Sequence, residues 1–379
     1  MVAIDSYAGG DGRLSPLSTP SATRAVLEAH GIGTKYTLGQ NFLVNDDVLK
    51  KIIALAEVGE NDRVLEVGPG IGTLTIALLK HAASVIAIER DPDLPAVLAD
   101  TLHPWREKFA LIEKDALDVT RDDIVAAMVE IGGDTGYPDR ASSAANETAQ
   151  WAVSQSEDCL SESGYPVAPP QEDLQLSLPS KLVADLPYAV AATVVLDYFE
   201  SFPFLDSATI MVQKEVADRM VAAVGTKNYG AYTVKLGLYA EPAGRFAVGP
   251  GNFFPPPRVD SAVIRLNRRV PLMADGAPAS PEVIAAAALM ADAAFTNRRK
   301  TIANSCKTYF SGRGPISLGA GPSAQEGAPG IVLPDGAAIA ERLAAIFDAA
   351  TIDPRRRGET LTQQEFLALG AALLKVTAA

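Results

Sequence analysis

Four consecutive residues in the middle of the chain, Asp185-Leu186-Pro187-Tyr188, combine a carboxylate, a rigid turn and an aromatic ring. Proline lacks the N–H that a sheet interior needs, so Pro187 is expected to end the apolar strand that begins near residue 181. Asp185 and Tyr188 then lie at the carboxyl end of that strand, where open α/β sheets bind their ligands. A strand followed by an ordinary turn explains this tetrapeptide equally well, so its interpretation depends on the rest of the chain.

A glycine-rich segment, EVGPGIGTL at residues 66–74, offers a second element of a binding site. It lies between a predicted buried strand and a predicted helix, and its three glycines allow the backbone to approach a ligand closely. The spacing is G-x-G-x-G, whereas a dinucleotide pyrophosphate is seated by G-x-G-x-x-G. No lysine follows that could bind a triphosphate. A tight turn without any ligand is the alternative interpretation.

Acidic residues end the next two predicted strands. Glu89 follows the glycines by roughly 20 residues, at the position where a carboxylate binds ribose hydroxyls. Asp115 ends the third strand and suits the amino group of adenine. Each could be an exposed acid without a function, but the array favours a nucleoside without phosphates, which indicates S-adenosylmethionine. Asp185 would then accept a hydrogen bond from the amine of a target adenine or cytosine, and Tyr188 would stack on the base.

Strands and helices alternate around these segments, as expected for βαβ units and a parallel sheet. Strands are predicted at residues 63–68, 84–90, 109–116, 181–186 and 208–213, with a closing pair at 232–240 and 261–268. Helices are predicted at residues 22–30, 46–56, 73–82, 93–102, 190–200 and from 214 onward. The predicted fold is α/β, a Rossmann-like parallel sheet over residues 23–270. A smaller all-helical domain is expected at 275–379, with a Gly/Pro-rich loop at 311–336.

Two segments are predicted to be disordered. Residues 1–22 are rich in Ser, Pro, Gly and Thr and resemble a flexible lead-in. Residues 119–180 carry 11 acids and 2 bases, a net charge of −9, and favour a disordered acidic insert, with a functional loop as the alternative.

The net charge of the whole chain, −13, at first argues against a nucleic-acid partner. Because most of that charge lies in the acidic insert, the remainder is only mildly acidic and contains basic clusters at 265–269, 297–300 and 354–357.

Metal sites, disulfides and membrane spans are not expected. The two cysteines form no disulfide framework, and the three histidines show no zinc-like spacing. No apolar run reaches the length of about 18 residues that a bilayer requires. The N-terminus lacks a basic start followed by an apolar stretch, which predicts a cytoplasmic protein.

The chain resembles the family of ribosomal RNA adenine dimethyltransferases that modify small-subunit rRNA. Matching motifs occur in the family order at residues 38–45, 66–75, 88–91, 185–188, 212–222, 252–266 and 294–305. The resemblance implies a class I methyltransferase fold for residues 23–270. It implies contacts to S-adenosylmethionine from Asn41, Leu43, Gly68, Gly70, Glu89, Asp115 and Asp185. It implies a catalytic group formed by Asp185, Leu186, Pro187, Tyr188 and Phe253. It also implies that rRNA phosphates meet Arg298, Arg299, Lys300 and Lys307.

Two of these implied roles have ordinary alternatives. Phe253 would be the second stacking face for a flipped adenine, or else a core aromatic. The basic cluster around Arg299 would bind rRNA, or else be partly a solvated surface. The usual family motif is Asn-Leu-Pro-Tyr, whereas this chain has Asp185; both residues offer an acceptor oxygen, so the reaction class is expected to be the same.

The resemblance implies N6-dimethylation of two adjacent adenines near the 3′ end of small-subunit rRNA, on an immature subunit and by a monomer. A large-subunit rRNA adenine methyltransferase of the macrolide-resistance type is one alternative. A ribosome assembly factor in which binding matters more than catalysis is another. An NAD-dependent dehydrogenase is disfavoured, because the glycine spacing and any hydride-transfer constellation are missing.

Overall fold

The computed structural model describes residues 12–32, 41–131, 178–313, 316–317, 330–331 and 337–378. Within them, seven strands form one sheet in the order β4-β3-β2-β5-β6-β9-β7. Five of the strands are parallel: β2 (Arg63–Val67), β3 (Ser84–Ile88), β4 (Phe109–Ile112), β5 (Lys181–Asp185) and β6 (Ser207–Gln213). Strand β9 (Ser261–Arg268) runs antiparallel to both β6 and β7 (Ala240–Val248). The parallel strands place their carboxyl ends along one edge of the sheet.

Helices cover both faces of this sheet, because successive residues of each strand point to opposite sides. Val64 joins one apolar core and its neighbour Leu65 joins the other. The first core contains α1 (Pro20–Ala29), α2 (Asp46–Ala56), α3 (Thr73–Leu79) and α4 (Leu94–Thr101). The second contains α5 (Arg121–Ile131), α8 (Ala191–Ser201), α9 (Lys214–Met220) and α10 (Ala231–Gly237). Short 3-10 turns are η3 (His103–Lys108), η4 (Ala116–Asp118), η5 (Pro250–Asn252) and η6 (Gly358–Thr360).

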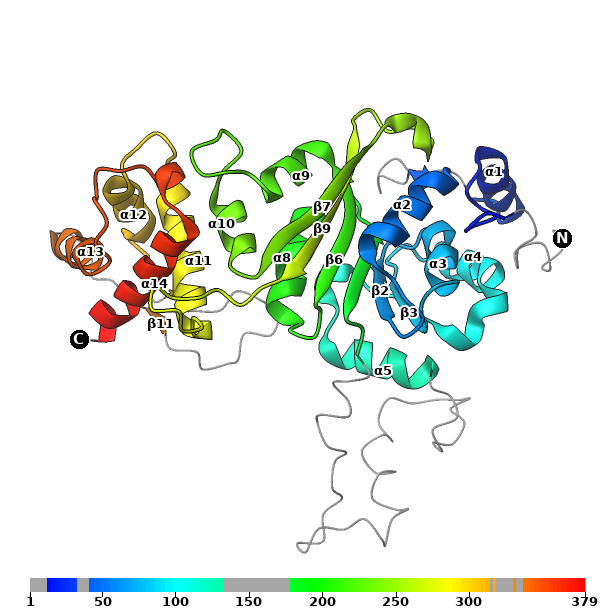
Figure 1. Cartoon of the computed structure of the whole chain (residues 1–379), viewed down its shortest axis with the longest axis horizontal. Helices are drawn as coiled ribbons and strands as arrows, with labels where there is room; N and C mark the ends of the chain where they lie inside the picture. The colour runs from blue at the N-terminus through cyan, green and yellow to red at the C-terminus, as the bar shows by residue number, and fades with distance from the viewer. Residues whose placement is uncertain are drawn as a thin grey trace, which may run out of the picture.

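Four C-terminal helices form a separate apolar core around Met290, Phe310 and Phe366. They are α11 (Pro281–Phe295), α12 (Ile302–Phe310), α13 (Ala337–Ala349) and α14 (Gln363–Ala378). Figure 1 shows them gathered beside the sheet, with α10 between them and the strands, while α1 lies at the opposite end of the molecule. An ion pair of 3.1 Å between Lys235 of α10 and Asp292 of α11 links the two parts. No helix in the described ranges is long and apolar enough to cross a membrane.

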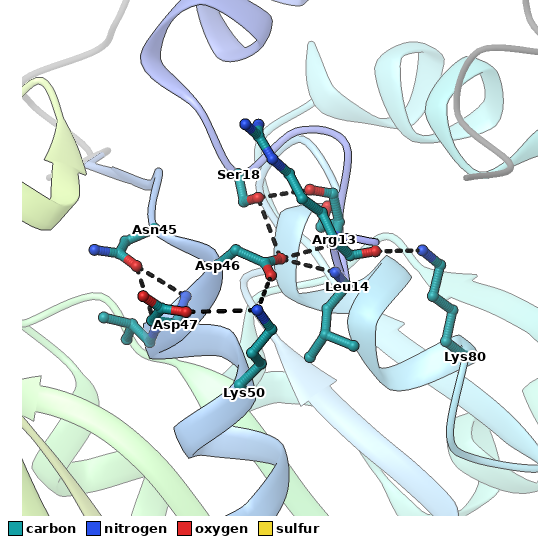
Figure 2. A network of polar contacts seen from close by, with 10 residues as sticks. Arg13, Leu14, Ser18, Asn45, Asp46, Asp47, Lys50 and Lys80 are labelled. Atoms are coloured by element: carbon teal, nitrogen blue, oxygen red, sulfur yellow. Dashed lines mark hydrogen bonds and ion pairs between the residues drawn. The ribbon is translucent and has the colours of Figure 1, made fainter. Parts of the chain in front are cut away.

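The part of the predicted lead-in that the structure describes is folded, so the prediction of disorder is wrong for residues 12–22. Oδ1 of Asp46 accepts hydrogen bonds from the N–H of Leu14 (2.8 Å) and of Ser15 (3.3 Å), as Figure 2 shows for Leu14. The other carboxylate oxygen of Asp46 pairs with Lys50 at 3.0 Å, and Leu17 is fully buried. The burial of Leu17 and the hydrogen bonds from the loop backbone to Asp46 order this segment despite its polar composition. Residues 1–11 lie outside the described ranges.

The beginning of the predicted acidic insert is also folded. Residues 121–131 form α5, whose Ile124 is fully buried, and the described chain resumes at Leu178, which is also buried. Asp122 and Asp123 occupy the first turn of α5, where negative charge favours the helix dipole. The prediction of disorder was based partly on these two acids, but in the structure they stabilise the N-terminus of a helix. The remainder of the predicted insert, 132–177, lies outside the described residues.

Two further predictions of secondary structure need correction. Residues 232–240 were predicted as a strand, but 231–237 form helix α10, because a short apolar run fits either period. The strand that closes the sheet beside β9 is β7, which the sequence analysis did not predict because it contains Pro242. Proline is tolerated there because β7 is an edge strand. Within the predicted loop 311–336, β10 (Ile316–Ser317) pairs with β11 (Gly330–Ile331).

Candidate active site

A cavity of about 400 Å³ lies at the carboxyl ends of β2, β3, β4 and β5. Its walls include every residue that the sequence predicted as catalytic or cofactor-binding: Asn41, Leu43, Gly68, Gly70, Glu89, Asp115, Asp185, Leu186, Pro187, Tyr188 and Phe253. These residues are spread over more than 200 positions of the chain, and the parallel strand ends and the β1–β8 pair bring them together. The predicted cofactor and target-base residues therefore share one cavity.

The glycine-rich turn lies directly against the Asp185 turn. Gly68 has a φ of 72°, in the left-handed region that a residue with a Cβ rarely adopts. A Cβ on Gly68 would lie 3.5 Å from the carbonyl oxygen of Asp185 and 3.6 Å from Cδ of Pro187. The two turns are thus in close contact, which holds the predicted methyl donor site next to the predicted acceptor site.

The Glu89 carboxylate is held by the backbone N–H groups of the two residues that follow it. Its Oε1 accepts hydrogen bonds from the N–H of Arg90 (2.9 Å) and of Asp91 (2.8 Å). Burial raises the pKa of the Glu89 carboxyl, and these N–H groups act in the opposite direction. A carboxylate fixed in this way is pre-oriented to accept hydrogen bonds from a ligand diol in the cavity.

Both carboxylate oxygens of Asp115 accept hydrogen bonds, one from the backbone and the other from an arginine side chain. Its Oδ1 accepts the Leu117 N–H at 3.1 Å and caps the short turn η4. Its Oδ2 receives a hydrogen bond of 2.8 Å from NH1 of Arg90. Arg90 also lines the cavity, although the sequence analysis assigned it no role. The predicted adenine partner is therefore ion-paired to a second cavity residue.

The Asp185-Leu186-Pro187-Tyr188 turn is fixed at both ends. The Leu186 N–H donates to Met211 of β6 at 3.0 Å, and the Pro187 carbonyl accepts two N–H groups at the start of α8. The Tyr188 hydroxyl lies 2.6 Å from Oγ of Ser261 on β9, which fixes the ring. Burial raises the pKa of the Asp185 carboxyl to about 8. A neutral carboxylic acid keeps one carbonyl acceptor, so near neutral pH this side chain resembles asparagine.

Phe253 reaches the cavity through a pairing of short strands that the sequence did not reveal. Strand β1 (Phe42–Leu43) pairs with β8 (Phe253–Phe254), with Leu43 opposite Phe253. Asn45 extends this contact, because its Nδ2 donates to Oδ1 of Asn252 at 2.8 Å. The pair places cofactor residues from the N-terminal part beside the predicted base-stacking residue.

Glu66 is a cavity residue that sequence reasoning missed. It is fully buried, and neither carboxyl oxygen has a hydrogen-bond partner within the described residues. Burial raises its pKa to about 8; the nearby Thr75 hydroxyl acts in the opposite direction, and the charges of Asp185 and Glu89 add to the rise. The sequence did offer a signal for Glu66, because it is an acid among the apolar residues of a strand that leads into the glycine-rich turn. A buried orphan carboxyl in a cavity indicates a ligand that donates hydrogen bonds or carries positive charge.

The four predicted RNA-binding residues lie in the helical part, and none of them lines the cavity. Arg298 differs from the other three because it donates to the Lys227 carbonyl at 2.8 Å and pairs with Glu359 at 3.3 Å. Arg299, Lys300 and Lys307 are exposed. The 354–357 cluster lies beside them, because the Ile302 N–H donates to the Arg356 carbonyl at 2.7 Å. The fold thus brings two basic segments together. Arg298 also connects the helical part to the sheet part, through its hydrogen bond to the Lys227 carbonyl.

Known proteins show the same fold and sequence pattern. The crystal structure of a dimethyladenosine transferase from Plasmodium falciparum matches with a TM-score of 0.56 and 19% identity, covering 88% of this chain and 98% of that one. Ribosomal RNA small subunit methyltransferase A from Geobacillus sp. strain WCH70 is 32% identical over 95% of this chain and 98% of its own length. The enzyme of the same name from Enterococcus faecalis is 32% identical over 95% and 97%.

The fold is that of the class I methyltransferases, and the relatives that share the sequence pattern are named as ribosomal RNA methyltransferases. The model of the ribosomal RNA adenine dimethylase family matches residues 33–314. The chain belongs to this family.

Proposed function

We propose that this protein dimethylates N6 of two adjacent adenines near the 3′ end of small-subunit rRNA. The observation that carries the proposal is the shared cavity, which is lined both by Glu89 and Asp115 and by Asp185, Tyr188 and Phe253. The curated relatives named for the small subunit support this choice of rRNA over the large subunit.

S-Adenosylmethionine supplies an electrophilic methyl group on a sulfonium when bound, and the residues present fit it. The orphan carboxyl of Glu66 suits its ammonium group, Glu89 suits the ribose hydroxyls, and Asp115 suits the adenine amine. Gly68 leaves room for the chain of the cofactor beside the Asp185 turn. A cavity of about 400 Å³ is within the range of small-molecule sites.

The Asp185 turn activates the target amine in this proposal. An adenine amino group is a poor nucleophile because its lone pair is delocalised into the ring. Asp185 accepts one N–H, and the Leu186 carbonyl is the second acceptor, since the Pro187 carbonyl is already bonded to α8. Tyr188 and Phe253 hold the flipped base between them, and this alignment supplies most of the rate.

The helical part, residues 275–379, is the rRNA-binding domain in this proposal. Its exposed cations, Arg299, Lys300 and Lys307, would neutralise rRNA phosphates despite the acidic total charge of the chain. The preferred substrate would be an immature small subunit rather than free rRNA. We propose further that the protein acts as a monomer in the cytoplasm.

A methyl-transfer assay tests this function. Purified, undermethylated small subunits, large subunits and free rRNA would each be incubated with the protein and radiolabelled S-adenosylmethionine. We expect small subunits to be the best substrate, with two dimethyladenines per particle identified by mass spectrometry of the rRNA. Transfer to large-subunit rRNA would instead support the macrolide-resistance type of enzyme. Normal cofactor affinity without transfer to any particle would support a ribosome assembly factor.

A further inference from the structure

Arg90 lies within the matching 88–91 segment, but the sequence analysis assigned a role only to its neighbour Glu89. It follows Glu89 directly at the end of β3 and lines the same cavity. Its guanidinium spans from β3 to the loop after β4, where NH1 lies 2.8 Å from Oδ2 of Asp115. The ion pair therefore joins the two strand ends that the proposed ribose and adenine contacts come from.

This ion pair contributes little to the stability of the fold, so a role in folding alone does not explain it. The side chain of Arg90 is 54% exposed and that of Asp115 is 32% exposed, and pairs of this kind contribute about 0–1 kcal/mol to folding. Most of the guanidinium thus remains available at the rim of the cavity. Arginine is also the side chain whose planar, charged face stacks best on aromatic rings.

We infer that Arg90 is a specificity-determining residue for the adenine ring of the cofactor: it holds Asp115 in place and lays its guanidinium against the ring face. Asp115 Oδ1 is occupied by the Leu117 N–H, so Oδ2 is the oxygen left for the adenine amine. A carboxylate oxygen has two lone pairs, so Oδ2 accepts from Arg90 and from the amine together. This inference rests on the proposed cofactor site and adds a residue to it.

The opposite role is a gate, in which Arg90 occupies Asp115 and must leave before adenine binds. The two roles predict effects of opposite sign. Loss of a stacking and orienting residue weakens cofactor binding, whereas loss of a competitor tightens it.

Calorimetric titration of the full-length protein with S-adenosylhomocysteine distinguishes them. We expect Arg90→Ala to raise the Kd about tenfold, the size of a partly desolvated cation–π contact. Arg90→Lys keeps a positive charge near Asp115 but has no planar face, so it should lose nearly as much. Arg106→Ala is the matched control, because that arginine is 67% exposed on η3 and does not line the cavity. The melting temperature of unliganded Arg90→Ala should stay close to that of the wild type.

Each other outcome overturns the inference. An unchanged Kd in Arg90→Ala would make the ion pair a surface feature, and a lower Kd would make Arg90 a gate. Full recovery in Arg90→Lys would show that charge suffices without the planar face. Glu89→Ala separates this inference from the proposed site: wild-type protein that fails to bind, or a Glu89→Ala variant that binds normally, would contradict the site itself.

Discussion

Asp185 is the residue on which the proposed chemistry depends most directly. Asp185→Ala removes the acceptor and should lower kcat by about 10²–10³-fold, the size of losing one preorganised hydrogen bond in an active site. Asp185→Asn keeps an acceptor oxygen and should retain activity. Single-turnover methyl transfer on small subunits measures both. Equal loss in the two variants, with normal cofactor affinity, would show that the carboxyl acts as a base rather than as an acceptor.

The pH dependence of the same variants gives an independent check. Because burial raises the pKa of Asp185 to about 8, the wild-type side chain becomes a carboxylate only as the pH approaches that value. A carboxylate accepts a stronger hydrogen bond than a neutral acid. The wild-type kcat should therefore rise with a midpoint near pH 8 and level off above it, whereas Asp185→Asn should show no such rise.

The buried carboxyl of Glu66 should make the free energy of unfolding depend on pH. Its pKa is raised from 4.5 to about 8, so the folded protein holds a proton that the unfolded chain releases in that interval. The wild type should therefore lose stability as the pH rises from 4.5 to about 8, and no further above it. The melting temperature of Glu66→Gln relative to the wild type should increase by a few degrees across this window. Glu107→Gln is the control, because its side chain is 88% exposed; a flat difference for Glu66→Gln would contradict the account.

At the scale of elements, α5 marks where the chain can be shortened. A variant that replaces residues 132–177 with a short Gly/Ser linker should fold and methylate, because α5 and Leu178 are retained. A variant that removes 122–178 loses Ile124, which is fully buried in the core. Truncating one buried aliphatic side chain costs about 2–5 kcal/mol, and here a whole helix is lost. Circular dichroism melting of both variants checks this; unfolding of the shorter deletion would show that 132–177 is required for the fold.

At the scale of the whole molecule, two neighbouring arginines should behave differently. Arg299→Ala removes an exposed cation and should reduce the slope of log affinity for rRNA against log salt by about 1. Arg298→Ala breaks the hydrogen bond to Lys227, which joins the two parts, and the ion pair with Glu359 inside the helical part, so it should chiefly lower the melting temperature. Filter binding over a salt series and thermal melting separate the effects. An unchanged slope in Arg299→Ala would exclude that side chain from the docking surface.

The sequence by itself predicted most of the sheet and a group of residues that line one cavity. Buried parallel strands are continuous apolar runs, and the residues that follow them must lie at one edge, so Gly68, Glu89, Asp115 and Asp185 could be grouped without coordinates. The resemblance to the family added Asn41, Leu43 and Phe253, which strand order alone does not bring to that edge.

Only the tertiary structure decided what those residues contact. The β1–β8 pairing spans more than 200 residues, and two-residue strands have no periodic pattern to read. The orphan state of Glu66, the bond from Arg90 to Asp115 and the junction role of Arg298 depend on what packs around each side chain. Local sequence specifies backbone preference and polarity, whereas burial, partner and pKa are properties of the assembled neighbourhood. This difference explains why the cavity residues were predictable and their electrostatic states were not.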